Sequence, residues 1–160
     1  MTKKLVVKPL RKDTYLTVIQ NACGSKMWAN NYALVNGKKE DILQNGSTSC
    51  AFFVSSILKM FDLIKDLHVT VNGTEKDLKQ SGWRRIAVTS KMPPGSILIW
   101  EKKKALEAKN KNTATHAHIG FYIGKEQAVS IWIFHNFPII HHWTYSGKRK
   151  VLRAYWNPKI

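Results

Sequence analysis

The stretch TSCAFFVSSILKMFDLI, residues 48–64, decides the fold of this chain. Its apolar residues recur at the three- and four-residue spacing of one helix face; they are Ala51, Val54, Ile57, Leu58, Phe61 and Ile64. Phe53 and Met60 widen that face, which predicts a helix buried near the centre of the molecule. Thr48 or Ser49 is predicted to cap the helix, and Cys50 then lies in its first turn.

The segments before this helix predict a second helix and a hairpin. A helix is expected from Asp13 or Thr14 to about Cys23, with Gly24 as its stop and Cys23 as a small core residue. Residues 32–39 contain an Asn-Gly turn after a short apolar run, which predicts a β-hairpin. After the central helix, a short helix is expected over residues 74–81, capped by Thr74.

The second half of the chain is typical of strands. Segments rich in β-branched and aromatic residues alternate with turn signals; they cover residues 84–89, 95–100, 116–123, 128–134, 138–145 and 150–156. The Lys-rich stretch 101–112 is expected to form an exposed loop or a frayed helix. Helices that precede strands in this way predict an α+β protein with a C-terminal antiparallel sheet, and 160 residues make one domain.

The charge of the chain limits the classes of partner. Lys and Arg number 26 against 10 Asp and Glu, a net charge of +16, which attracts polyanions such as nucleic acid or acidic cell-envelope polymers. No run approaches the roughly 20 apolar residues of a membrane span. The first residues lack the apolar core of a signal peptide, so the expected location is the cytoplasm unless another route exports the protein.

Cys50 and His118 form a candidate catalytic pair. Backbone N–H groups and the helix dipole at a helix N-terminus stabilise a thiolate, and the same N–H groups can hold an oxyanion. A cysteine nucleophile also needs a base, and His118 begins a predicted strand. The chain has two cysteines, too few for a disulfide framework.

Three segments resemble the NlpC-type cell-wall cysteine peptidases. Residues 49–54 (SCAFFV) resemble the nucleophile motif of that family, residues 94–100 (PGSILIW) its glycine strand and residues 118–124 (HIGFYIG) its histidine strand. The resemblance covers about residues 48–130. It implies a papain-like fold and a single catalytic domain that cleaves an amide bond in bacterial peptidoglycan stem peptides. It implies Cys50 as nucleophile, His118 as general base and acid, and no metal or cofactor.

The sequence departs from the family at the residue that orients the histidine. The family places His, Asn or Gln twelve positions after the histidine, where this chain has Ser130. A hydroxyl can accept a hydrogen bond from an imidazole N–H. Ser130 is therefore one candidate for the third residue, and His141, His142 and Asn136 on or near the next strand are the others. A turn near Gly124-Lys125 is expected to bring residues 130–131 beside His118.

Other residues are candidates for the substrate cleft. Tyr32 and Ser49 precede the nucleophile, and Trp143 alternates with Tyr145 on a predicted strand. His116 and His118, with His141 and His142, could form a zinc site. No Cys or carboxylate lies close to them in the sequence, so no metal is expected.

The sequence thus predicts a thiol hydrolase, with two alternatives. A thiol acyltransferase would use the same fold and the same pair. A non-enzymatic basic module would bind nucleic acid or another polyanion through its charge and its aromatic residues.

Overall fold

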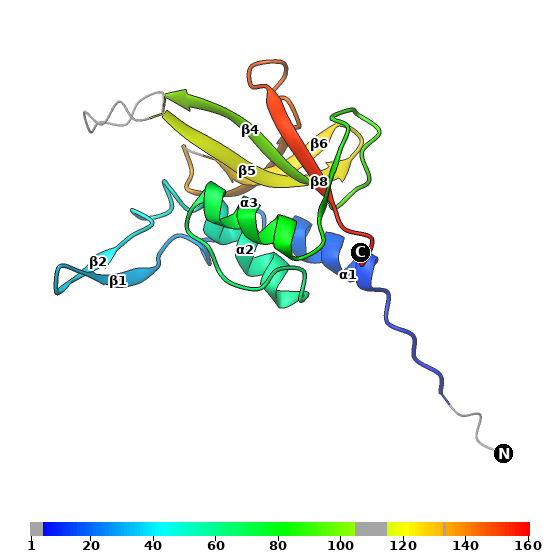
Figure 1. Cartoon of the computed structure of the whole chain (residues 1–160), viewed down its shortest axis with the longest axis horizontal. Coiled ribbons are helices and arrows are strands. Elements are labelled where there is room, and N and C mark those ends of the chain that lie inside the picture. The colour runs from blue at the N-terminus through cyan, green and yellow to red at the C-terminus, as the bar shows by residue number, and fades with distance from the viewer. Residues whose placement is uncertain (1–4, 105–114, 133) are drawn as a thin grey trace.

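The computed structural model describes residues 5–104, 115–132 and 134–160, and these residues form an α+β structure. Three helices lie on one side of a six-stranded antiparallel sheet, and a separate hairpin projects from the body (Figure 1). The helices are α1 (Arg11–Asn21), α2 (Cys50–Met60) and α3 (Val71–Gln80), and the hairpin pairs β1 (Tyr32–Val35) with β2 (Lys38–Asp41). The sheet contains β3 (Arg84–Ile86), β4 (Ile97–Lys104), β5 (Thr115–Gly124), β6 (Gln127–Trp132), β7 (Phe137–His142) and β8 (Val151–Trp156). Its strand order is β3-β8-β4-β5-β6-β7.

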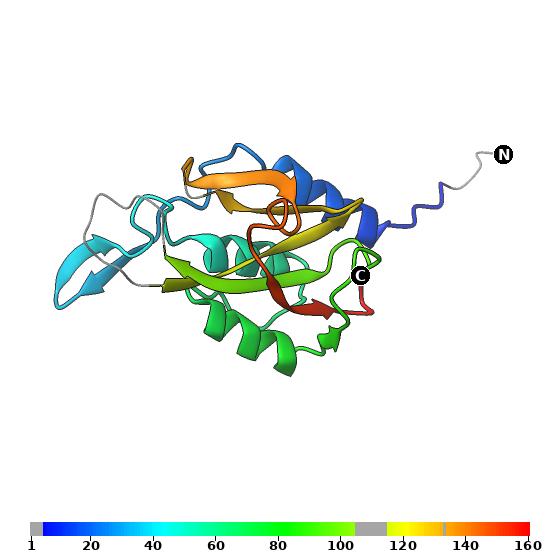
Figure 2. The same ribbon diagram turned by 90° about the horizontal axis from the view of Figure 1, so that it is seen from above.

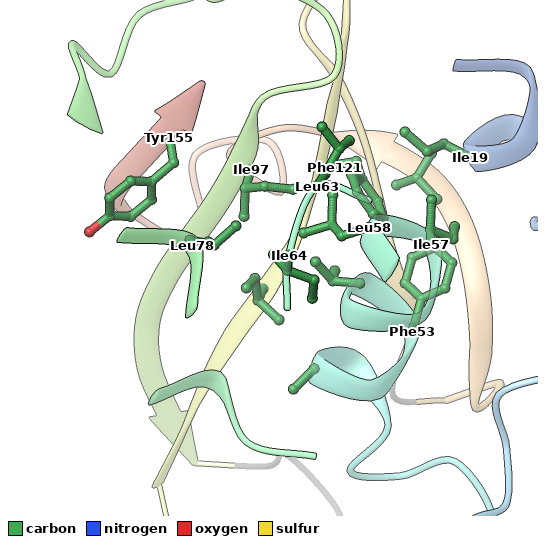
Figure 3. Packing of buried hydrophobic residues seen from close by; sticks show 14 of the residues in the cluster. Ile19, Phe53, Ile57, Leu58, Leu63, Ile64, Leu78, Ile97, Phe121 and Tyr155 are labelled. Carbon is green, nitrogen blue, oxygen red and sulfur yellow. The ribbon is translucent and has the colours of Figure 1, made fainter. Parts of the chain in front are cut away.

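Helix α2 lies at the centre of the core, as its periodicity predicts. Phe53, Ile57 and Leu58 are fully buried and lie against Phe121 of β5 and Ile19 of α1 (Figure 3). Cys50 is the first residue of the helix. The predicted side-chain cap is wrong, because Ser49 Oγ donates to Gly46 O at 2.8 Å and does not bond to the helix.

The two elements before α2 are confirmed, with one change in detail. Helix α1 begins at Arg11, earlier than predicted, and no side chain caps it. Its Tyr15 is fully buried and donates its hydroxyl to Gly95 O at 3.1 Å, which ties α1 to the start of β4. The hairpin turns at Asn36 and Gly37, both with positive φ, as an Asn-Gly turn requires.

Helix α3 begins earlier than predicted. Thr70, not Thr74, caps it by accepting a hydrogen bond from Gly73 N at 3.1 Å. Thr74 is fully buried inside the helix instead. No helix in the described part of the chain is long and apolar enough to cross a membrane.

The two faces of the sheet have different coverings. Ile119, Phe121 and Val129 point to the face that packs on the helices. Trp100 and Tyr122 belong to a second cluster on the opposite face. That face carries the loop of residues 143–149, which lies on the side of the sheet away from the helices in Figure 1 and in front of the sheet in Figure 2, seen from above.

Several predicted strand boundaries are wrong. Strand β3 ends at Ile86, and β7 ends at His142, so Trp143 and Tyr145 lie in the following turns and not on a strand. Residues 101–104 of the predicted Lys-rich loop continue β4, while residues 105–112 lie outside the described residues. Strand β4 continues because Lys103 pairs with His116 beyond a register shift that follows Trp100.

Candidate active site

Cys50 lies at the N-terminus of α2, half-buried beside strand β5. Burial raises the pKa of its thiol, and the backbone N–H groups of Ile119 and Ala51 and the charge of Arg149 lower it only in part. The thiol is therefore protonated at neutral pH. The surrounding N–H groups favour negative charge when it develops on the sulfur, or on an oxygen of the carbon that the sulfur attacks.

His118 precedes Ile119 on β5, and its ring has a defined partner. Its Nε2 lies 2.9 Å from the hydroxyl oxygen of Ser130, the residue twelve positions later. The ring of Trp100, which faces His118 across the β4–β5 pair, lies 5.4 Å away between centroids. Burial, together with the charges of Arg149 and His141, holds the pKa of His118 well below its ordinary value. The imidazole is therefore neutral at pH 7 and able to accept a proton.

Ser130 is fully buried and connects three side chains. Besides His118, its hydroxyl lies 2.8 Å from His141 Nε2 and 2.8 Å from the Tyr145 hydroxyl. The structure thus places two of the sequence candidates for the third residue, Ser130 and His141, in one network. The His142 ring is not part of this network. Its Nδ1 lies 2.9 Å from the hydroxyl of Thr144, in the loop that follows β7. Asn136 lies in the turn between β6 and β7.

The register of β5 and β6 brings Ser130 to His118. Phe121 pairs with Val129 and Tyr122 pairs with Ala128. The turn between these strands uses the positive φ angles of Lys125 and Glu126, one residue later than predicted.

Gly120 is essential to this packing. A side chain at this position would place its Cβ 2.6 Å from Val129 O and 2.7 Å from Ser130 Cβ. These separations are shorter than van der Waals contact, so only glycine lets β6 approach closely enough for Ser130 to reach His118.

Aromatic rings enclose the network. The His141 and Tyr145 rings stack with centroids 4.1 Å apart, and Trp132 stacks on Tyr145 at 5.5 Å. Trp100 Nε1 donates to Trp143 O at 2.7 Å and holds the 143–149 loop on the sheet face opposite the helices. Burial is the main reason why the pKa of His141 falls to about 4 and that of Tyr145 rises to about 12.

Arg149 is a charged neighbour that the sequence analysis missed. Its guanidinium donates to Glu101 O at 3.0 and 3.1 Å and to His116 O at 3.1 Å, and it lies 6.0 Å from the Tyr145 ring. Its positive charge lowers the pKa of both Cys50 and His118. No periodic pattern marks it, because it reaches the site from an irregular loop.

The three cleft candidates occupy different places. Tyr32 is 60% exposed on the hairpin, with the Lys39 ammonium 4.8 Å from its ring centroid. Ser49 is fully buried in the turn before α2. Trp143 lines a pocket of about 500 Å³ that also contains Glu101 and Arg149. Hydrogen bonds between described residues join none of these side chains to His118.

The neutral histidines predict a loss of stability in mild acid. Below pH 6.5 the unfolded chain binds a proton on His118 and on His141, whereas folded His141 does so only near pH 4 and the pKa of folded His118 is also depressed. The free energy of unfolding should therefore fall as the pH falls, and His141 alone should contribute up to about 3 kcal/mol by pH 4.

Urea denaturation at pH 7, 6 and 5 measures this effect. The carboxyl groups whose pKa is lowered in the folded protein, such as Asp77, titrate below this pH range. The change in the free energy of unfolding between pH 7 and 5 therefore reports on the histidines. His141→Gln, which cannot ionise there, should show a smaller loss. A stability that stays flat from pH 7 to 5 contradicts the burial of neutral histidines.

Among the described residues, no group of three or more His, Cys, Asp or Glu side chains is arranged to hold a metal ion.

Comparison with known proteins adds no family to these observations. No protein-family model matches the chain, and no curated protein shows significant similarity to it.

Proposed function

We propose that this protein is a thiol hydrolase with a papain-like fold that cleaves an amide bond. The observation that supports it best is the arrangement at β5. Cys50 begins a buried helix with the N–H of Ile119 beside its thiol, and the preceding residue, His118, has its Nε2 held by Ser130. Nucleophile, base and orienting group are the three parts that covalent thiol catalysis needs.

The pair starts the reaction uncharged. The pKa of Cys50 is raised and that of His118 is lowered, so the thiol and the imidazole are both neutral at pH 7. As the sulfur attacks the carbonyl carbon, a C–S bond forms and the thiol proton passes to the free nitrogen of His118. The carbonyl oxygen becomes an oxyanion, which N–H groups at the start of α2 stabilise.

The second half of the reaction returns every group to its first state. His118 gives its proton to the leaving amine as the C–N bond breaks, and a thioester remains on Cys50. Water then attacks the thioester and gives a proton to His118. The C–S bond breaks, the acid product leaves and the proton returns to the sulfur.

The substrate class in this proposal is the stem peptide of bacterial peptidoglycan, which the three sequence resemblances support. The net charge of +16 would concentrate the enzyme on anionic envelope polymers, and the protein would reach them by lysis or by an exporter. Arg149 adds a local positive charge beside the thiol.

A non-catalytic polyanion-binding module is the second candidate, and the same net charge favours it. It makes no use of the buried network around Ser130. An acyltransferase would share every step up to the thioester and differ only in the acceptor that replaces water.

The test is to incubate the protein with purified peptidoglycan and with synthetic stem peptides. Hydrolysis should release new primary amines, and an acid quench should trap an acyl group on the peptide that contains Cys50. A new amide formed on an added amine would instead indicate a transferase. Salt-sensitive retention on the polymer with neither amine release nor acyl adduct would favour the binding module and overturn the hydrolase.

A further inference from the structure

We propose that His141 is a positioning residue that acts through Ser130 and fixes the proton of His118 on Nε2. This inference deepens the proposed function, and it rests on His118 being the base. It depends on the polarity of consecutive hydrogen bonds, which follows from which atoms can donate.

The backbone carbonyl of His142 determines the first bond. His141 Nδ1 lies 2.9 Å from His142 O, and a carbonyl oxygen can only accept. Nδ1 of His141 therefore carries a hydrogen. A neutral imidazole has one N–H, so Nε2 of His141 is left with a lone pair.

Ser130 passes this polarity on. Its hydroxyl has one hydrogen, and the lone pair of His141 Nε2, 2.8 Å away, must receive it. The two remaining partners of the Ser130 oxygen, at 2.8 and 2.9 Å, must then both donate. Tyr145 does so through its O–H and His118 through an N–H on Nε2. The hydroxyl thereby makes one donated and two accepted bonds, its full capacity.

The tautomer of His118 determines which of its two ring nitrogens can act as the base. A neutral His118 with its hydrogen on Nε2 has its lone pair on Nδ1, and Nε2 carries the only ring hydrogen bond that it makes within the described residues. If His118 is the base of the proposed reaction, Nδ1 is thus the ring nitrogen whose lone pair is left to accept the proton of Cys50. With the opposite tautomer, Nδ1 would carry the hydrogen and have no lone pair, so the nitrogen that is free of Ser130 could not act as a base.

The reverse polarity requires a charge on His141. If Ser130 donated to Tyr145 or to His118, His141 Nε2 would have to donate as well, and His141 would be an imidazolium. Arg149 and His142 disfavour that charge, the rings stacked around His141 partly bury it, and the pKa of His141 is about 4. The other ionisable neighbours, His118 and Tyr145, carry no negative charge at pH 7 that would favour it.

The first measurement needs no substrate. Nitrogen-15 NMR of the histidine rings of the wild-type protein at pH 7 should show the Nε2–H tautomer for His118 and the Nδ1–H tautomer for His141. The opposite tautomer at either ring overturns the inference. This result is independent of activity, so it separates failure of the proton relay from failure of the proposed hydrolase.

The second measurement uses variants at His141. His141→Phe keeps a ring in the stack but removes the acceptor, so the Ser130 proton is free to turn to His118 Nε2. We expect His118 to shift toward Nδ1–H, and kcat to fall at least tenfold with KM changed less than twofold. His141→Gln restores an acceptor oxygen and should recover most of the Nε2–H tautomer and of kcat.

The matched control is His135→Phe, an exposed histidine outside the network that stacks on Phe137. It should leave the His118 tautomer and kcat unchanged. If His141→Phe keeps the Nε2–H tautomer of His118, or if His141→Gln fails to restore it, His141 does not position His118. Should His141→Phe not fold, the wild-type tautomers still decide the question.

Discussion

Cys50→Ala should abolish amide hydrolysis, with turnover reduced by a factor on the order of 10⁴ or more, because loss of the nucleophile leaves no covalent route. The substitution removes one half-buried sulfur and leaves the backbone of α2 intact. We therefore expect a loss of only about 1 kcal/mol in the free energy of unfolding. Initial rates of amine release, measured beside circular dichroism of the same sample, check both values.

Cys23→Ala is the matched control for that experiment. Cys23 is also half-buried, follows α1 and packs against the same core, and burial raises the pKa of its thiol too. The two variants lose the same atom in similar surroundings, so only the catalytic role distinguishes them. Activity of Cys50→Ala within tenfold of the wild type would remove Cys50 from the mechanism.

Gly120→Ala should disrupt the site from within the sheet. The new methyl group would meet the backbone oxygen of Val129 and the Cβ of Ser130 below 3 Å, and neither atom can move without displacing β6. We expect a destabilisation of about 3 kcal/mol. We also expect a loss of hydrolysis greater than this destabilisation explains, because displacement of β6 withdraws Ser130 from His118.

Gly82→Ala separates packing from simple glycine loss. Gly82 has φ +87° and no atom within 4 Å of an added Cβ, so the substitution costs only the backbone strain of about 1 kcal/mol. Its activity should match the wild type when both are measured well below their melting temperatures. If Gly120→Ala behaves in the same way, the close approach of β5 and β6 does not support the site.

The sequence predicts those parts of the fold that depend on local chemistry. The apolar spacing of residues 51–58 is that of a helix with one buried side, and α2 is buried on that side. The Asn36-Gly37 turn needs only residues that tolerate positive φ. The caps are less predictable, because Thr70 and Thr74 have the same propensity and only tertiary packing decides that Thr74 is buried.

The surroundings of the candidate pair depend on contacts that no local pattern records. The sequence predicts that Ser130 lies near His118, because a tight turn determines which residues of β6 lie beside β5. The sequence does not predict Arg149 in the site, and it places Tyr145 on a strand and not in a loop, because a hydrogen bond from Trp100 to Trp143, 43 residues away, positions the loop of residues 143–149. The extension of β4 through Lys103 is hidden for the same reason, since lysines are poor strand formers and only pairing with His116 places them there.

The buried hydroxyl of Ser130 also restricts how this chain can change during evolution. Replacing it with an apolar side chain would leave three partly buried polar groups, on His118, His141 and Tyr145, without their common partner. Single substitutions among these four positions are therefore costly in any order. Descendants of this protein should keep all four residues together, or should replace them as a set when an amide or imidazole at position 130 reaches His118 directly.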